Sequence, residues 1–314
     1  VIIVGLFFSI IYNVLAANLR AIGDAYTPLI FLIISAVLNV ALDILCVKYM
    51  DMGVRGAAVA TIVSQAVSAV LCFGYTWKKY AFLHFNIKDF VPKKEFLKPM
   101  VEGGLSMGLM NSLVSFGTLS LQMAINTLGT NTIVAHAATR KLTNLYMLPF
   151  SVLGTTMATY SGQNYGAGRY DRIRAGLKVS LGCSYIWCVI VLIASYTVCP
   201  YLIVAITDTG ISEVIDTACL YQRFDTCFYL LVPTITILRN SLQGIGDHIT
   251  PIFSSGLELV GKVLIAMLLT PVIGYWGIIV SEPIVWAVMV IPLIVSMVKR
   301  MKRAFVNEKI RNEK

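Results

Sequence analysis

Apolar runs long enough to cross a lipid bilayer follow one another along almost the whole of this 314-residue chain. A transmembrane helix needs about 20 predominantly apolar residues. Soluble domains carry about 25% charged residues, whereas this chain has 13%, and 57% of it is hydrophobic. The composition excludes a cytosolic enzyme, a disordered tail and a disulfide scaffold. It indicates an integral membrane protein whose function lies within or across the membrane.

Polar breaks divide the apolar runs into nine predicted transmembrane helices. Their approximate bounds are residues 1–19, 27–47, 56–77, 100–128, 132–159, 177–198, 216–238, 250–269 and 277–298. We expect an all-α polytopic fold with four parts: a three-helix bundle over 1–80, a cytoplasmic linker over 81–99, a six-helix bundle over 100–299 and a basic cytoplasmic tail over 300–314. Because Val1 already lies inside an apolar run, we expect the chain to be a segment of a longer protein.

Basic residues gather on one side of this predicted topology. Five loops and tails on that side hold nineteen of the 25 Lys and Arg residues: Arg20, Lys78, Lys79, Lys88, Lys93, Lys94, Lys98, Arg169, Arg172, Arg174, Lys178, Arg239, Lys299, Arg300, Lys302, Arg303, Lys309, Arg311 and Lys314. The opposite loops hold Lys48 and Arg55. By the positive-inside rule the first side, with the C-terminus, is cytoplasmic. Contacts with anionic lipids explain the net charge of +9 without nucleic acid.

The pattern L-x-x-I-G-D-x-x-T-P occurs twice, at residues 19–28 and 242–251, each time between two predicted helices. Glycine permits a tight turn, aspartate can accept hydrogen bonds from backbone N–H groups, and Thr-Pro suits the first turn of a helix. We therefore assign a structural role to Gly23, Asp24, Pro28, Gly246, Asp247 and Pro251. The repeat predicts two pseudo-symmetric bundles of six helices, of which this chain holds about nine of twelve.

The chain resembles the multidrug and toxic compound extrusion (MATE) family. The residues that carry the resemblance are the paired G-D-x-x-T-P turns, Asn39 with Asp43, the segment 53–61 (GVRGAAVAT) and the segment 162–168 (GQNYGAG). This resemblance implies cation-coupled antiport of small organic, often cationic, substrates across the plasma membrane. It implies no cofactor other than a coupling ion, Na⁺ or H⁺. We expect the protein to contact lipids, to bind no nucleic acid, and to be a monomer.

A candidate cation site lies on the second and third predicted helices. Asn39 and Asp43 are four residues apart and share a helix face, and Thr61 lies on the next helix. Oxygen ligands suit Na⁺, whereas a carboxyl group in a poorly hydrated pocket suits proton exchange, so the coupling ion stays open. The resemblance implies that these three residues form part of the family's N-terminal cation site.

Intramembrane charges in the larger bundle are candidates for lining or gating a cavity, because each is costly unless paired. Glu258 and Lys262 are predicted to form an ion pair at i and i+4. Arg140 and its neighbours His136 and Lys141 place positive charge at depth, and pairing with Glu258 or Glu282 stays open. The same group of candidates includes Glu282, Gln122 and Asn126. Arg223 and Asp225 are expected to pair near the outer interface.

Other functional classes have little support. The chain has no G-x-S-x-G, H-E-x-x-H, Walker or dinucleotide motif, so we expect no enzymatic activity. Its seven cysteines never form C-x-x-C, and apart from Na⁺ near Asp43 we expect no metal. The alternative function is that of a lipid-linked oligosaccharide flippase from the same wider superfamily. That alternative would favour a more basic cavity.

Overall fold

The computed structural model describes residues 2–84, 93–208 and 210–312, and these residues form helices and turns without a strand. The chain divides into two compact units, Val1–Lys93 and Lys94–Lys314. The boundary lies inside the expected linker over 81–99, of which residues 85–92 are outside the described residues. Helix α4 already begins at Lys94 and includes Pro99. Because Pro99 has no N–H, it cannot donate the helical hydrogen bond to the carbonyl four residues earlier.

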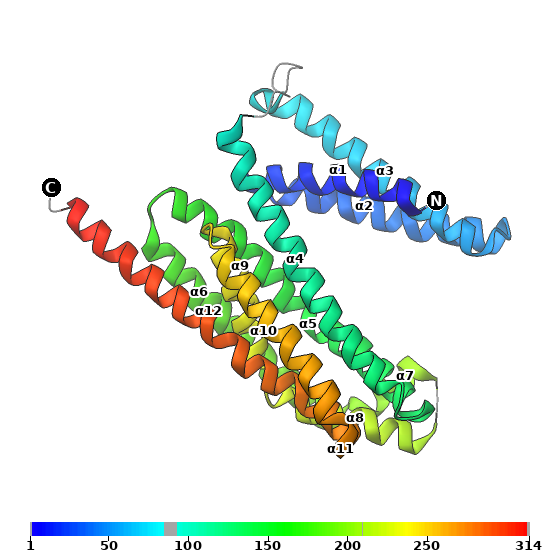
Figure 1. Ribbon diagram of the computed structural model, residues 1–314. Helices are drawn as coiled ribbons and strands as arrows, with labels where there is room; N and C mark the ends of the chain where they lie inside the picture. Colours follow the sequence, from blue (N-terminus) through cyan, green and yellow to red (C-terminus); the bar gives the residue numbers. More distant parts are fainter. Residues whose placement is uncertain (1, 85–92, 209, 313–314) are drawn as a thin grey trace. The chain divides into compact units, whose positions relative to one another are not determined.

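The first unit has three long helices (Figure 1). They are α1 (Ile2–Ala21), α2 (Tyr26–Asp43), which continues as a π-helix (Ile44–Tyr49), and α3 (Gly53–Lys79), followed by a short 3₁₀ turn (Ala81–Leu83). Helix α3 packs against both α1 and α2. Small buried residues such as Ala60 and Ser64 let the helices approach closely. Ser35 Oγ of α2 donates a hydrogen bond of 2.7 Å to the Ser64 carbonyl of α3.

The second unit holds the remaining helices (Figure 1). They are α4 (Lys94–Ile125), α5 (Thr130–Gly166), α6 (Tyr170–Thr197), α7 (Cys199–Thr207), α8 (Ser212–Thr226), α9 (Leu231–Gly244), α10 (Ile249–Leu268), α11 (Thr270–Ile273) and α12 (Tyr275–Asn312). Helix α5 packs on α9, α6 and α8, whereas α10 packs between α4 and α12. The main core includes Phe150, Ile173, Tyr229 and Leu242, all almost fully buried. Helix α12 extends through most of the expected tail, of which residues 313–314 are outside the described residues.

Helices α5 and α9 meet backbone to backbone. A Cβ atom on Gly244 would lie 2.2 Å from the carbonyl oxygen of Ala158, and one on Gly162 would lie 3.0 Å from the carbonyl oxygen of Gly244. No side chain fits in such a gap, so glycine at these positions sets how closely the two helices pack.

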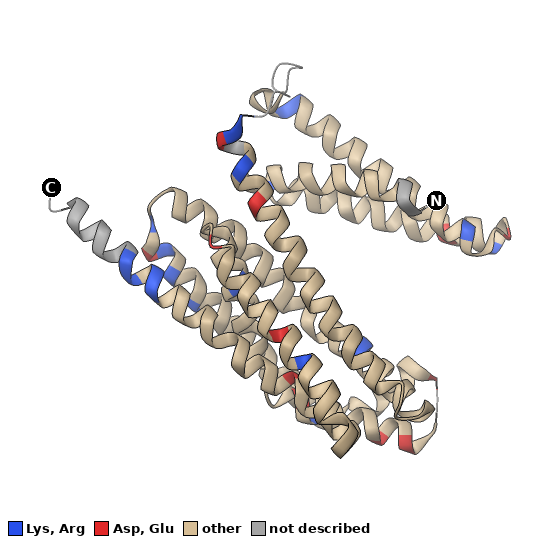
Figure 2. Cartoon of the chain, in the orientation of Figure 1, with Lys and Arg blue, Asp and Glu red and all other residues tan. Residues whose placement is uncertain are grey.

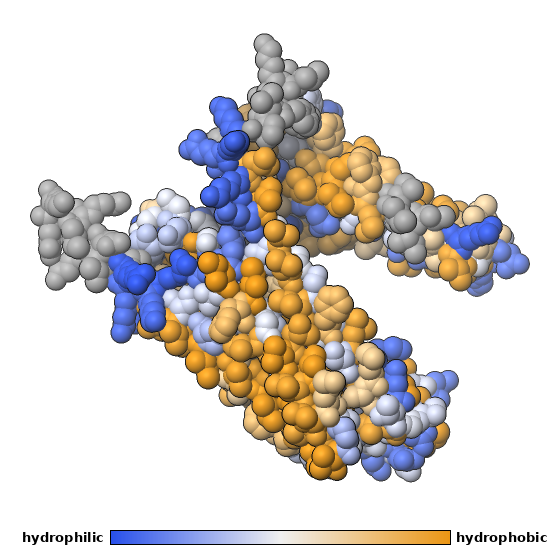
Figure 3. Space-filling model, in the orientation of Figure 1, coloured by the Kyte–Doolittle hydropathy of each residue, from blue (hydrophilic) through white to orange (hydrophobic). Residues whose placement is uncertain are grey.

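Hydrophobic residues cover the side of the second unit seen in Figure 3, and hydrophilic residues gather at its two ends. Among the described residues, five helical segments are long and apolar enough to cross a membrane: Tyr26–Tyr49, Gly53–Lys79, Tyr170–Thr197, Ile249–Leu268 and Tyr275–Arg303. The other expected spans correspond to α1, α4, α5 and the pair α8 and α9. These helices are shorter, more polar or interrupted, so fewer spans stand out by length and composition than the sequence predicts.

The expected span over 216–238 is not one continuous helix. Helix α8 ends at Thr226 and α9 begins at Leu231, and the turn between them has hydrogen bonds from Phe228 to Asp225 (3.0 Å) and from Leu231 to Phe228 (3.0 Å). Pro233 has no N–H to bond the carbonyl four residues earlier, and its ring excludes that carbonyl from helical geometry. The proline therefore accounts for the interruption, which the apolar character of the segment conceals.

Candidate functional site

Two polar side chains of α2 form the first candidate site. Asn39 and Asp43 are half-buried and lie on one face of the helix. The Nδ2 atom of Asn39 and the Oδ1 atom of Asp43 are shielded from solvent, and neither has a hydrogen-bond partner among the described residues. A buried polar atom without a partner costs about 1–3 kcal/mol. A cation or proton bound at Asp43 Oδ1 would recover that atom's part of the cost, whereas the amide N–H groups of Asn39 need an acceptor.

Thr61, the third expected member of this site, is exposed on α3. Its hydroxyl donates a hydrogen bond of 2.9 Å to the carbonyl of Ala57, which orients the oxygen within its own helix. The structure gives no hydrogen bond from Thr61 to Asn39 or Asp43 among the residues it describes. The π-helix begins at Ile44, directly after Asp43, and π-helical turns occur frequently at functional sites.

Five charged side chains form a continuous series of ion pairs in the second unit. Arg239 Nη2 lies 3.5 Å from Glu258 Oε2, and Glu258 Oε1 lies 3.0 Å from Lys262 Nζ. Lys262 Nζ also lies 3.2 Å from Glu282 Oε1, which lies 3.5 Å from Arg140 Nη1. We call these residues the charge network. Its members come from α9, α10, α12 and α5, so the ion pairs join four helices.

Three members of the charge network are almost completely buried: Lys262 is 3% exposed, Glu282 5% and Glu258 6%. Removing an isolated charge from water costs several kcal/mol, and ion pairs with good hydrogen-bonding geometry offset that cost. Positive and negative side chains alternate along the network, so each carboxylate lies between two cations.

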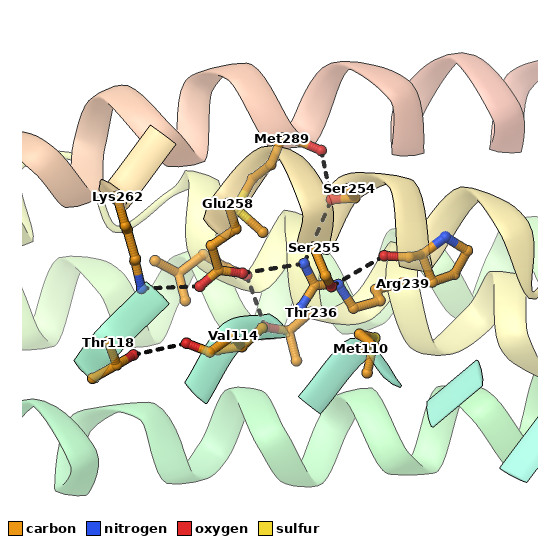
Figure 4. Close-up of polar contacts among 12 residues, drawn as sticks. Met110, Val114, Thr118, Thr236, Arg239, Ser254, Ser255, Glu258, Lys262 and Met289 are labelled. Atoms are coloured by element: carbon orange, nitrogen blue, oxygen red, sulfur yellow. Dashed lines mark hydrogen bonds and ion pairs between the residues drawn. The ribbon is translucent and has the colours of Figure 1, made fainter. Parts of the chain in front are cut away.

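Figure 4 shows Glu258 between Lys262 and Arg239. Arg239 also contacts Ser254 Oγ at 3.5 Å, and that hydroxyl donates a hydrogen bond of 2.9 Å to the Met289 carbonyl of α12. The network is thereby tied to the backbone of α12 as well as to its side chains.

The sequence predicts the Glu258–Lys262 pair from its spacing but does not predict that Glu282 shares Lys262. The expectation that Arg239 lies in a cytoplasmic turn is wrong, because this residue lies on α9 with 12% of its side chain exposed. The apolar run ends at Leu238, whereas the helix continues to Gly244. The signal that could have shown this is the absence of glycine and proline between Arg239 and Gly244.

His136 and Lys141, the neighbours of Arg140 on α5, are not in the charge network. His136 is buried, and its Nδ1 atom lies 3.2 Å from the hydroxyl of Tyr275. Lys141 is exposed. Only Arg140 of the three pairs with Glu282 among the described residues.

The expected pair of Arg223 and Asp225 is not formed. Arg223 Nε donates a hydrogen bond of 3.4 Å to the Ser195 carbonyl. Asp225 is 1% exposed, and its Oδ1 atom has no hydrogen-bond partner among the described residues. The two side chains are two residues apart on α8 and therefore point to different sides of the helix. Asp225 is therefore a buried acid, whereas the sequence analysis expected it to pair with Arg223 near the outer interface.

Gln122 and Asn126 lie near the end of α4. Gln122 Nε2 donates a hydrogen bond of 2.9 Å to Asn126 Oδ1; Gln122 is half-buried and Asn126 is exposed. They do not contact the charge network in the described part of the chain. No group of three or more His, Cys, Asp or Glu side chains with metal-binding geometry occurs among the described residues.

The two repeated turns have nearly the same backbone geometry. Gly23 has φ of 94° and Gly246 has φ of 82°, both in the left-handed region that favours glycine. The N–H of the following aspartate donates to the carbonyl of the residue five positions earlier, at 2.9 Å for Asp24 and 2.8 Å for Asp247. Pro28 and Pro251 are each the third residue of the following helix and are buried.

The aspartate of each turn accepts hydrogen bonds from the last long helix of its own unit. Asp24 Oδ2 accepts from the Tyr75 hydroxyl at 2.9 Å, on α3. Asp247 Oδ2 accepts from Ser296 Oγ at 2.8 Å and from Arg300 Nε at 2.9 Å, both on α12. In both turns the aspartate therefore holds the turn against a long helix, although the partner residues differ.

The family model MatE matches residues 107–272, more than half of the chain. The chain belongs to the MatE family. This assignment confirms the resemblance expected from the sequence.

Two curated relatives of this MatE family member have names that refer to drug export. It is 31% identical over 170 residues to the probable multidrug resistance protein YpnP of Bacillus subtilis (strain 168), which covers 54% of this chain and 38% of the relative. It is 26% identical over 264 residues to the multidrug export protein MepA of Staphylococcus aureus (strain MSSA476), covering 83% of this chain and 55% of the relative. The chain therefore spans only about two fifths to just over half of these relatives.

Solved structures share the fold. An outward-facing multidrug resistance MATE family transporter of the MOP superfamily matches with a TM-score of 0.87 at 21% identity, covering 96% of this chain and 68% of that one. A structure of MATE in the bent conformation matches with a TM-score of 0.86 at 19% identity, with the same coverage. These matches confirm the expected all-α fold. The MatE match and the apolar helices identify a multi-pass membrane protein.

Proposed function

We propose that the full-length protein containing this chain exports small organic, often cationic, compounds in exchange for Na⁺ or H⁺. The observation that carries the proposal is the MatE match, together with relatives named for multidrug resistance and export. Transport by alternating access suits a molecule built from two repeated bundles. The residues proposed to line or gate the transport pathway are Glu258, Lys262, Glu282, Arg140, Gln122 and Asn126.

The cation site proposed for this exchange is centred on Asp43. The carboxylate and the amide oxygen of Asn39 are hard ligands of the kind that Na⁺ prefers, and Thr61 offers a third oxygen on α3. The unpartnered Oδ1 atom of Asp43 supports a role in binding rather than in packing. An ion can drive export only by binding one conformation more tightly than the other, so we propose that occupancy at Asp43 favours the conformation that releases substrate outward.

The experiment that tests this proposal measures efflux of a fluorescent cationic dye from cells that carry the full-length protein. Wild type is compared with Asp43→Asn under separately imposed Na⁺ and proton gradients. The control is Asp51→Asn, which removes an exposed carboxylate in the turn before α3. We expect one gradient to drive efflux by wild type and the control, and Asp43→Asn to lose it while still reaching the membrane.

Unaltered efflux by Asp43→Asn would overturn the cation site. Absence of efflux under both gradients, from protein shown to be in the membrane, would overturn the exporter proposal. The lipid-linked oligosaccharide flippase would then become the leading candidate, because the charge network contains three cations and two anions and a positively charged interior suits an anionic head group.

We further propose that the protein is a monomer in the plasma membrane with a cytoplasmic C-terminus. The cytoplasmic C-terminus is supported by the basic cluster of α12, shown in Figure 2, which follows the positive-inside rule. Labelling with an impermeant maleimide tests the orientation in a cysteine-free background. Met50→Cys should react in intact cells and Arg172→Cys only after permeabilisation, and the reverse pattern would contradict the orientation.

A further inference from the structure

A basic cavity of about 490 Å³ lies where α5, α6, α10 and α12 come together at one end of the second unit. Three cations of α12 line it: Lys299, Arg300 and Arg303. They lie at the C-terminal end of the segment Tyr275–Arg303, which is long and apolar enough to cross a membrane. The cavity therefore lies at the level where the hydrocarbon layer meets water.

The cavity is lined by more basic than acidic side chains. Asp247 lines the cavity, but Arg300 Nε donates to its carboxylate at 2.9 Å, as does Ser296 Oγ at 2.8 Å. Arg300 remains 40% exposed in spite of this contact. Lys299 and Arg303 have no ion-pair partner among the described residues, so they are the uncompensated charges of the site.

The positions of these two residues favour an anion between them. Lys299 and Arg303 are four residues apart, so they lie on one face of α12 and repel each other. An anionic group between them would attract both side chains and offset their mutual repulsion. Tyr170 at the start of α6 lines the same cavity and is half-buried, and its hydroxyl is a further hydrogen-bond donor.

Apolar side chains continue outward from the cavity along two helices. Ile249 lines it at the start of α10 and is 80% exposed, and Phe253, one turn further along, is 58% exposed. On α12, Val295 and Ile291 lie one and two turns before Lys299 and are 44% and 58% exposed. A ligand that fits both surfaces has an anionic head and hydrocarbon chains.

We propose that this cavity binds the phosphate head group of an anionic phospholipid such as phosphatidylglycerol, with its acyl chains along Ile249 and Phe253. Basic pockets between helices at a membrane surface bind such head groups. The bound phosphate would connect α12 with the start of α6 and the start of α10. This site is separate from the cation site at Asp43, and it does not depend on the proposed transport function.

The test measures lipid binding to the purified full-length protein by native mass spectrometry. Phosphatidylglycerol and phosphatidylcholine are titrated against wild type, against Lys299→Gln/Arg303→Gln, and against Arg174→Gln/Lys302→Gln. The last variant is the matched control, because it removes one Lys and one Arg at exposed positions that do not line the cavity. Lys299→Arg tests whether positive charge at that position is sufficient.

We expect wild type to bind phosphatidylglycerol in preference to phosphatidylcholine. The cavity variant should bind phosphatidylglycerol at least about tenfold more weakly, since each basic residue near an anionic lipid surface contributes substantially. The matched control and Lys299→Arg should stay within about twofold of wild type, because they keep the positive charge of the cavity. Gel filtration and the melting temperature without lipid establish that every variant is folded.

Three results would overturn the proposal. Equal weakening in the matched control would show that overall charge, not the cavity, attracts the lipid. Equal binding of phosphatidylcholine would show that no anionic head group is recognised. Complete displacement of phosphatidylglycerol by millimolar glycerol 3-phosphate or inorganic phosphate would identify the occupant as a soluble phosphate compound. Retention of the lipid under those conditions would support the amphiphilic site.

Discussion

Glu258 is the residue on which the buried charges of α9 and α10 converge. Its two carboxylate oxygens contact different cations, Lys262 at 3.0 Å and Arg239 at 3.5 Å. Lys262 has a second carboxylate partner in Glu282, whereas Arg239 has Glu258 as its only carboxylate partner among the described residues. Neutralising Glu258 would therefore leave Arg239 without a carboxylate partner among the described residues, whereas Lys262 would keep Glu282.

We expect Glu258→Gln to destabilise the full-length protein by about 3 kcal/mol, the usual scale for removing one member of a buried ion pair. The melting temperature of the purified protein measures this effect. Glu102→Gln is the control, because Glu102 pairs with Lys98 at the surface with 57% of its side chain exposed. An exposed pair of that kind contributes at most about 1 kcal/mol. Equal shifts in the two variants would contradict a structural role for the charge network.

At the scale of the helices, the close approach of α5 and α9 is the contact most sensitive to a single methyl group. A Cβ atom at position 244 would meet backbone, not a movable side chain. We expect Gly244→Ala to destabilise the protein by about 1–3 kcal/mol, the range for overpacked interiors, and to lower its melting temperature. Gly182→Ala on α6 is the control, since its Cβ would enter open space. A melting temperature unchanged by Gly244→Ala would show that the helices separate without cost.

How far the sequence predicts the structure depends on whether a feature is local. The helices follow from apolar runs, and the turn glycines follow from the repeated motif, because both patterns lie within a few residues. The break at Pro233 was also local, but its apolar neighbours concealed it. The burial of Asp225 and Arg239 depends on which helices pack around them, and neither residue carries a sequence signal for that packing. The pairing of Glu282 with Lys262 joins α12 to α10 and required the tertiary structure.

At the scale of the whole molecule, the two repeated turns have nearly the same backbone geometry in both units, although their aspartates have different hydrogen-bond partners. In the first unit the turn carboxylate is held by the hydroxyls of Tyr75 and Tyr80, and in the second by Ser296 and Arg300. Tyr75 lies in the last turns of α3 and Tyr80 directly after it, whereas Arg300 lies in the C-terminal half of α12. Each turn thereby fixes the end of one helix against the start of another.

These contacts predict a dependence of stability on pH. Burial would raise the pKa of Asp24, but hydrogen bonds from Thr27, Tyr80 and Tyr75 outweigh it and lower the pKa well below its ordinary value of 3.8. In Asp247 burial is likewise outweighed by hydrogen bonds, and its pKa is also lowered from 3.8. A lowered carboxyl pKa contributes stability that is present above the unfolded-state pKa and is lost as the pH falls below it.

We therefore expect the melting temperature of the full-length protein to fall as the pH is lowered through 3.8 toward the folded-state pKa values. Asp24→Asn/Asp247→Asn should melt at a lower temperature than wild type at neutral pH, and this difference should shrink in acid because wild type loses the same contacts there. Asp51→Asn, an exposed carboxylate, should follow wild type at every pH. Since the two turns belong to different compact units of the chain, the single variants should each show part of the shift, and their shifts should add. A constant difference between wild type and the double variant across the acid range would mean that the carboxylate charges do not stabilise the turns.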